Sequence, residues 1–148
     1  MQEIMSDEEY KKLPSLKDAD PLTLAEAVHD ILYDKRGRNI KILKVESQTV
    51  ITDYLVLCTG TSGTQVRGLA DEVEYKTSLR HLHPTGVEGR GNSSWIALDY
   101  GTVMVHIFNR DARDFYNLDK LYGTTTEISS DEGVETNENT QETQETDS

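Results

Sequence analysis

The stretch Trp95–Phe108 reads WIALDYGTVMVHIF, and its two alternating halves predict two β-strands folded at a turn. Gly101 lies in the short link between the halves, where it can supply the positive φ that a tight turn needs. We expect the loop to consist of the two residues Tyr100 and Gly101. The stretch therefore predicts a β-hairpin, and the rest of the chain can be placed around it.

Alternation sorts the hairpin side chains onto two faces. One face carries aliphatic residues that suit a buried core, namely Ile96, Leu98, Val103, Val105 and Ile107. The other face mixes aromatic, thioether, imidazole and carboxylate groups, from Trp95, Ala97, Asp99, Thr102, Met104, His106 and Phe108. With the two-residue loop, Trp95 would lie opposite His106 and Ala97 opposite Met104. Alternation permits two interpretations of the mixed face, a second layer under a helix or a surface for a partner.

The residues before the hairpin predict a helix, two strands and a second helix. A capping box at Thr23 and Glu26 predicts a helix over about 24–36, followed by a strand over 40–46. Residues 53–60 form the most continuous apolar segment, which we expect at the centre of the sheet. A second capping box, at Ser62 and Gln65, predicts a helix that continues towards Arg80.

The remaining elements complete an α/β fold. Val87 marks a possible short strand, and Asn109 is a candidate N-cap for a helix through Tyr116. We expect this last segment to pack back on the sheet through Phe115, Leu118, Leu121 and Tyr122. The order of the elements predicts a mixed β-sheet flanked by helices.

Composition divides the 148 residues into three parts. Residues 1–20 carry six acidic residues and three lysines and predict a flexible N-terminal arm. Residues 21–126 form the expected folded domain, with 13 acidic against 12 basic residues. Residues 127–148 contain eight acidic residues and no Lys or Arg, which predicts a disordered acidic tail. The net charge of −12 therefore belongs mostly to the ends.

The charge pattern and composition also limit the partners and the compartment. No basic stripe suited to phosphates stands out, so we expect no direct sequence-specific binding of nucleic acid. Cys58, the one cysteine, lies in an apolar segment and is typical of a protein from a reducing compartment. The sequence shows neither a signal peptide nor a long apolar run, and we expect no membrane partner and a cytoplasmic location.

Motifs for catalysis and cofactor binding are weak. The glycine turn at 60–63 matches neither of the phosphate-binding glycine motifs, and the pair His81 and His83 lacks further metal ligands nearby. Asp53, Glu88 and Asp99 could supply carboxylates for nucleotidyl or phosphate transfer, although turn, loop and strand-end roles explain them more simply. We therefore expect no enzyme, no catalytic residue, no cofactor and no metal site, and the transfer enzyme stays as the alternative.

Several spaced motifs together resemble the Iojap family, the ribosomal silencing factors. They are DYLVLCTGTS at 53–62, QV at 65–66, ADEV at 70–73, EG at 88–89, WIALDYG at 95–101, VHIF at 105–108 and RDFYNL at 113–118. The resemblance covers about residues 22–123. It departs at the last helix, which often ends with an acidic residue, a leucine and a tryptophan in the family, whereas this chain has Asp119-Lys-Leu-Tyr122 and so keeps an aromatic residue.

The resemblance implies a non-enzymatic factor with a mixed α/β sheet, related to nucleotidyltransferases but without their catalytic motifs. Such a factor binds ribosomal protein L-fourteen on the large subunit, blocks joining of the small subunit and represses translation when nutrients are limiting. Organellar members are linked instead to assembly of the large subunit, which is a second alternative. Isolated members can form homodimers off the ribosome.

The resemblance also implies which residues contact the ribosomal protein. The family motifs assign this role to Trp95, Asp99, Tyr100 and His106. Met104 joins them by its place on the mixed face of the hairpin. These five side chains are the predicted partner-binding residues.

Overall fold

The computed structural model describes residues 5–45, 52–91, 93–121 and 126–131. In these residues, strands and helices follow one another along the chain: α1 (Asp7–Lys11), α2 (Pro21–Asp34), β1 (Arg38–Lys44), β2 (Tyr54–Gly60), α3 (Gly63–Leu79), β3 (Gly86–Glu88), β4 (Trp95–Asp99), β5 (Val103–Asn109), α4 (Arg110–Tyr116), α5 (Leu118–Leu121) and β6 (Thr126–Asp131). None of the helices in this part of the chain is long and apolar enough to span a lipid bilayer.

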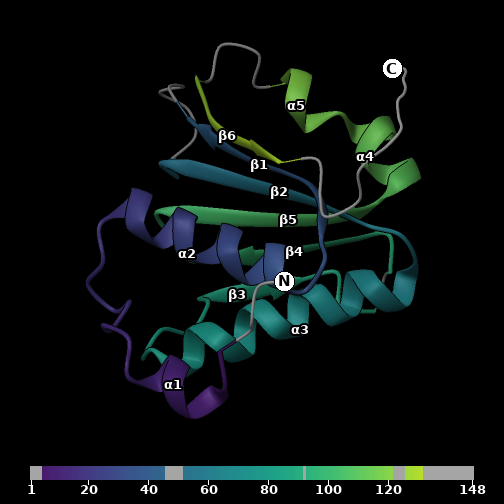
Figure 1. Cartoon of the computed structure of the whole chain (residues 1–148). Helices are drawn as coiled ribbons and strands as arrows, with labels where there is room; N and C mark the ends of the chain where they lie inside the picture. The colour runs from purple at the N-terminus through teal and green to yellow at the C-terminus, as the bar shows by residue number, and fades with distance from the viewer. Residues whose placement is uncertain (1–4, 46–51, 92, 122–125, 132–148) are drawn as a thin grey trace.

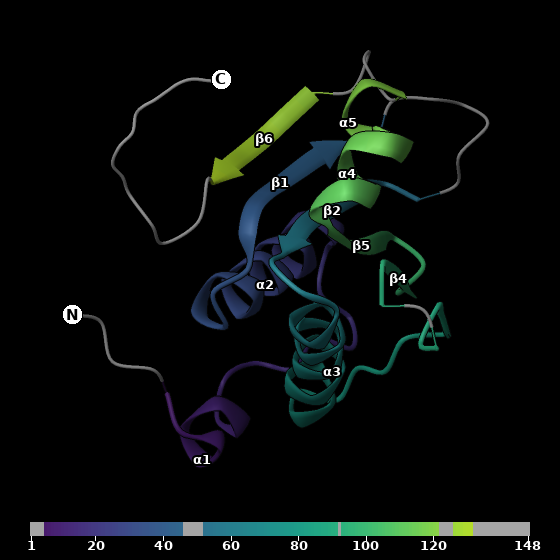
Figure 2. The same ribbon diagram turned by 90° about the vertical axis from the view of Figure 1, so that its right-hand side faces the viewer.

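The strands form one sheet in the order β3-β4-β5-β2-β1-β6. β2 and β5 pair in parallel at its centre, and the other neighbouring strands pair antiparallel. The predicted mixed sheet flanked by helices is confirmed, with the apolar segment β2 in its interior. α2 and α3 cover one face and α4 and α5 lie on the other (Figures 1 and 2).

Each face of the sheet has its own apolar cluster. The larger cluster joins α2 and α3 to the aliphatic face of the hairpin, including Ile96, Leu98, Val103, Val105 and Ile107. The smaller one lies beneath α4 and α5 and contains Leu43, Leu55, Leu57, Phe108, Ala112 and Leu118. The predicted core face of the hairpin is therefore confirmed, and its mixed face lies on the side of the smaller cluster.

The hairpin turn differs from the predicted one. The backbone N–H of Tyr100 donates to the carbonyl of Val103 at 2.9 Å, so the loop consists of Gly101 and Thr102. Gly101 has the expected positive φ, at 84°. Trp95 consequently lies opposite Phe108 rather than His106, and Ala97 lies opposite His106. Because the shift is two residues, every side chain of the two strands keeps its predicted face.

Capping decides where the three longer helices begin. Ser62 accepts a hydrogen bond from the N–H of Gln65, and Asn109 from the N–H of Ala112, which confirms two predicted N-caps. The first long helix differs, because the Asp20 carboxylate accepts from the N–H of Thr23 and α2 begins at Pro21. Proline suits the first helical position because its missing N–H would have no partner there.

The N-terminal arm is packed against the domain in the described residues, which corrects the predicted flexible arm. Leu16 is only 2% exposed, and its N–H donates to the carbonyl of Arg80 at 2.8 Å. In α1, Asp7 accepts hydrogen bonds from the Tyr75 hydroxyl at 2.6 Å and from Lys76 Nζ at 3.3 Å. The arm therefore contributes a side chain to the larger core cluster.

The predicted tail is also partly corrected. Thr126–Asp131 form β6, which pairs antiparallel with β1 and adds an edge strand to the sheet. Backbone pairing with a preformed strand can order a segment that is too polar to build a core. Residues 132–148 lie outside the described residues, so their predicted disorder stays a prediction, as do the boundaries of the folded domain.

Candidate functional site

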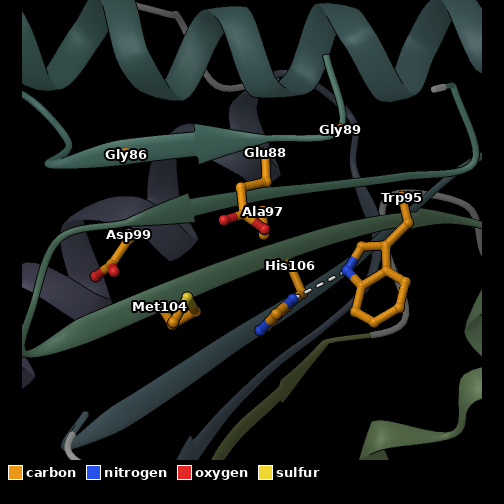
Figure 3. Close-up of a pocket in the computed structure, with 8 residues that line it drawn as sticks. All are labelled: Gly86, Glu88, Gly89, Trp95, Ala97, Asp99, Met104 and His106. Carbon is orange, nitrogen blue, oxygen red and sulfur yellow. Dashed lines mark hydrogen bonds between the residues drawn. The ribbon is translucent and has the colours of Figure 1, made fainter. Parts of the chain in front are cut away.

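A groove of about 390 Å³ opens on the mixed face of the hairpin, at the β3–β4 end of the sheet. Three strands supply its lining, as Figure 3 shows: Gly86, Glu88 and Gly89 from β3 and the residue after it, Trp95, Ala97 and Asp99 from β4, and Met104 and His106 from β5. Four of the five predicted partner-binding residues, Trp95, Asp99, Met104 and His106, therefore lie together. All four are partly exposed.

The groove follows from the alternation of the strands. Ile96 and Leu98 turn into the core beneath α3, so the residues between them must face the opposite side. β5 behaves in the same way until its end, where Phe108 is fully buried against α4. The interpretation as a second layer under a helix is confirmed at Phe108, whereas the side chains nearer the turn line an open groove.

Trp95 forms one end of the groove and belongs to an aromatic cluster. Its ring centroid lies 4.4 Å from that of Tyr116, 5.0 Å from Phe108 and 5.7 Å from His106. Tilted aromatic rings at such distances attract one another beyond the burial of their surface. The indole ring is therefore held in place by its aromatic neighbours.

His106 is fixed by a hydrogen bond to this indole. Trp95 Nε1 lies 3.0 Å from His106 Nδ1 (Figure 3). An indole N–H can only donate, so Nδ1 accepts and the imidazole proton resides on Nε2. Burial lowers the pKa of His106 from 6.5 to about 4. The groove therefore contains a neutral imidazole at neutral pH.

Asp99 closes the opposite end of the groove and also holds the turn. One carboxylate oxygen accepts the backbone N–H of Gly101 at 2.8 Å. The backbone carbonyl of Asp99 accepts from both the N–H and the hydroxyl of Thr85, at 2.7 and 3.0 Å. The side chain is therefore oriented by the turn while still facing the groove.

Tyr100 is the predicted site residue that the structure places elsewhere. It is 7% exposed, lies in the larger core cluster, and its hydroxyl is 2.8 Å from that of Thr77 in α3. Burial raises the pKa of Tyr100 to about 12. Tyr100 therefore does not join the groove, because it continues the alternation of Ile96 and Leu98 and faces the larger core cluster on the opposite side of the sheet.

The carboxylates of the enzyme alternative do not converge on one point. Glu88 and Asp99 both line the groove, whereas Asp53 lies outside its lining, just before β2. Among the described residues, no three His, Cys, Asp or Glu side chains are grouped so that they could hold a metal ion.

Sequence reasoning did not place Glu88 and Gly89 in the groove or Tyr116 in the aromatic cluster at its Trp95 end. Glu88 pairs with Ala97 across β3 and β4, a register that a three-residue strand in a glycine-rich segment does not reveal. Gly89 has φ +88°, and a Cβ there would clash with the carbonyl oxygen of Trp95. Tyr116 comes from α4, whose orientation over the sheet cannot be read from seven residues.

Comparison with known proteins shows to which family this chain is related. The family model described as "Ribosomal silencing factor during starvation" matches residues 18–148. The chain belongs to the family of ribosomal silencing factors. A relative in Haemophilus influenzae, named ribosomal silencing factor RsfS, is 36% identical over 101 residues, which are 68% of this chain and 99% of the relative. The Bacillus subtilis protein of the same name is 36% identical over 61% of this chain and 76% of its own length.

The organellar branch of the family is also similar. The Arabidopsis thaliana protein named "Protein Iojap-related, mitochondrial" is 32% identical over 68% of this chain and 56% of its own length. The resemblance to the Iojap family is therefore confirmed. These relatives are named as silencing factors or Iojap proteins and not as enzymes.

Crystal structures support the same fold. A protein from Chromobacterium violaceum is 28% identical and superimposes with a TM-score of 0.67, covering 70% of this chain and 87% of the other. A protein from Bacillus halodurans is 29% identical with a TM-score of 0.59, covering 73% and 95%. The α/β core of this silencing-factor family member is thus shared with both proteins.

Proposed function

We propose that the protein is a ribosomal silencing factor that docks on ribosomal protein L-fourteen of the large subunit through the groove of β3, β4 and β5. Bound there, the domain prevents the small subunit from joining by occupying the space that it needs. Translation falls when nutrients are limiting. No chemical reaction is required, and the protein acts where ribosomes are, in the cytoplasm.

The observation that carries this proposal is the groove itself. Family membership points to the ribosome, and the groove is where aromatic, thioether and charged side chains of the family motifs meet. Interfaces are enriched in Trp and Met at their centres, and preorganised anchors lose little entropy on binding. Trp95 and Met104 are such anchors, because the strands and the aromatic cluster already hold them.

Co-sedimentation with purified large subunits tests the proposal. Trp95→Ala removes the main anchor and is expected to weaken binding by roughly thirtyfold or more, since a buried aromatic anchor contributes roughly 2–4 kcal/mol. Trp95 also packs on Phe108, so circular dichroism must first show that the variant is folded. Met104→Glu changes the groove without altering the aromatic cluster and is expected to abolish pelleting.

Met5→Glu is a matched control, because Met5 is 39% exposed and lies beside α1 and α2, outside the groove. It should bind as the wild type does. Folded Trp95→Ala and Met104→Glu proteins that pellet like the wild type would refute the groove as the docking site. If the wild-type protein pellets with complete large subunits but not with large subunits that lack L-fourteen, the result supports L-fourteen as the partner.

A further inference from the structure

The groove carries negative charge on two of its sides. Glu88 of β3 and Asp99 of β4 both line it, and Figure 3 shows both carboxylates on the groove side of the sheet. Gly86 pairs with Asp99 and Glu88 pairs with Ala97, so the two acidic residues are diagonal neighbours. Diagonal residues on one face of an antiparallel pair lie about 7–8 Å apart, which leaves room for one group between their carboxylates.

No basic side chain in the described part of the chain balances this charge. The lining contains neither Lys nor Arg, and the described ion pairs involve neither Glu88 nor Asp99. His106 is neutral at neutral pH, because its Nδ1 accepts the indole N–H. The groove is therefore an electronegative slot, complementary to a cation.

The floor of the slot is apolar. Met104 lies opposite Asp99, and Ala97 lies between Glu88 and His106 across the sheet, and both are partly exposed. A long cationic side chain has an aliphatic stem that can cover such a floor while its charged end reaches the acidic groups. A methionine adapts its shape to a flexible stem more readily than a branched residue does.

We propose that the groove binds one arginine or lysine side chain of the ribosomal partner, with its cationic end between Glu88 and Asp99 and its stem over Met104 and Ala97. Glu88 is thereby a specificity-determining residue of the docking surface. The inference rests on the proposed function, since it names the chemistry by which that same groove recognises a partner. An acidic or purely aliphatic anchor would leave the two carboxylates desolvated without a counter-ion.

Isosteric neutralisation tests this slot. Glu88→Gln and Asp99→Asn keep the size of each side chain, and the asparagine oxygen can still accept the N–H of Gly101. Binding of each full-length variant to purified large ribosomal subunits is measured by co-sedimentation at several salt concentrations. We expect each change to weaken binding on the order of fivefold to tenfold at low salt and to flatten its salt dependence. Glu88→Lys should weaken binding further.

Glu26→Gln is the matched control, because Glu26 is exposed on α2, on the opposite face of the sheet, and it should bind like the wild type. If Glu88→Gln and Asp99→Asn bind as tightly as the wild type while Met104→Glu does not, the cation slot is refuted and the docking groove stands. If Met104→Glu also binds normally, or the wild type does not bind, the proposed function fails together with the slot.

Discussion

At the residue scale, the groove depends on a hydrogen bond between two side chains from neighbouring strands. Trp95 Nε1 donates to His106 Nδ1, and the indole ring also contacts Tyr116 and Phe108. His106 can accept this bond only while its Nδ1 carries no proton. The position of the main anchor is therefore linked to the protonation of one histidine.

His106 should make the stability of the protein depend on pH. Burial lowers its pKa from 6.5 to about 4, so the unfolded chain gains a proton at a higher pH than the folded one. The free energy of unfolding should therefore decrease as the pH falls from about 6.5 to about 4, by at most roughly 3 kcal/mol. Urea denaturation followed by the fluorescence of Trp95, the single tryptophan, measures this loss.

His106→Gln should flatten this profile, because a glutamine carbonyl can still accept from the indole but does not titrate. His83→Gln, at an exposed position outside the groove, should keep the profile of the wild type. Parallel profiles for the wild type and His106→Gln would show that another group causes the loss.

Two aromatic residues show where sequence prediction reaches its limit at this scale. Tyr100 was expected on the binding surface and is buried, whereas Phe115 was expected to pack on the sheet and is 80% exposed. Tyr100 in fact continues the alternation of Ile96 and Leu98 into the core, so the family motif, and not the strand pattern, led to its place among the binding residues. A helix as short as α4 has too few turns for its spacing to distinguish the buried stripe from the exposed one.

At the element scale, one buried arginine connects α4 and α5 to the sheet. Arg113 of α4 is 5% exposed and donates from Nε and Nη2 to the two carboxylate oxygens of Asp119 at 2.9 and 3.0 Å. Its Nη1 donates to the carbonyl of Asn39 and to the hydroxyl of Thr59. The Asp119 pKa is lowered by the Arg113 guanidinium and by Lys41, against the opposing effect of burial.

Replacing this arginine should destabilise the protein. Arg113→Met fills a similar volume but leaves the partly buried Asp119, Thr59 and Asn39 groups without their donor, which we expect to cost roughly 2–4 kcal/mol. Urea denaturation at neutral pH gives the change. Arg110→Met, at the exposed first residue of α4, should change the stability by less than about 0.5 kcal/mol. Equal stabilities for the two variants would argue against the role of the buried network.

The N-terminal arm offers a second test at this scale. Leu16 is 2% exposed within the larger core cluster, so Leu16→Ala should lower the free energy of unfolding by roughly 2–4 kcal/mol. The neighbouring exposed Lys17→Ala should leave it nearly unchanged. If Leu16→Ala has no effect in thermal or urea denaturation, the arm does not contribute to the core in solution.

Element boundaries were predictable where capping residues mark them and less so elsewhere. Ser62 and Asn109 carry short acceptors directly before an apolar stripe, and both helices begin there. The arm was predicted to be flexible because its composition as a whole is highly charged. Its attachment depends instead on one apolar residue, Leu16, and a few hydrogen bonds to α3. The hairpin register was missed because Gly101 fits either of two loops that are offset by one residue, and this offset shifts the pairing of the strands by two residues.

At the scale of the whole molecule, the first residues of the acidic C-terminal part form an edge strand, β6. β6 covers the edge of β1, whose residues would otherwise present unpaired backbone groups to solvent. The groove lies at the opposite end of the sheet, beside β3. The protected edge and the proposed docking site therefore lie at opposite ends of the sheet.

Two truncations should separate these roles. A chain that ends at Asp131 retains β6 and should pellet with large subunits as the full chain does and run as the same species in gel filtration. A chain that ends at Thr125 exposes the edge of β1 and should self-associate with rising concentration, because unpaired edges recruit other strands. Weak docking by the longer truncation, or an unchanged elution volume for the shorter one, would contradict this division.

The parallel pairing of β2 with β5 has a consequence for how the chain acquires its fold. Tyr54 pairs with Val103 and Gly60 with Asn109, and α3, β3 and β4 all lie between the two strands in sequence. Contacts between distant segments form slowly, because a long loop must be closed before they can form. During synthesis, α2 and the antiparallel pair β1–β2 can form early, whereas the centre of the sheet must await emergence of β5. In the nascent chain, β2 would therefore lack its parallel neighbour until β5 has been made. β5 is also the strand that completes the proposed docking groove.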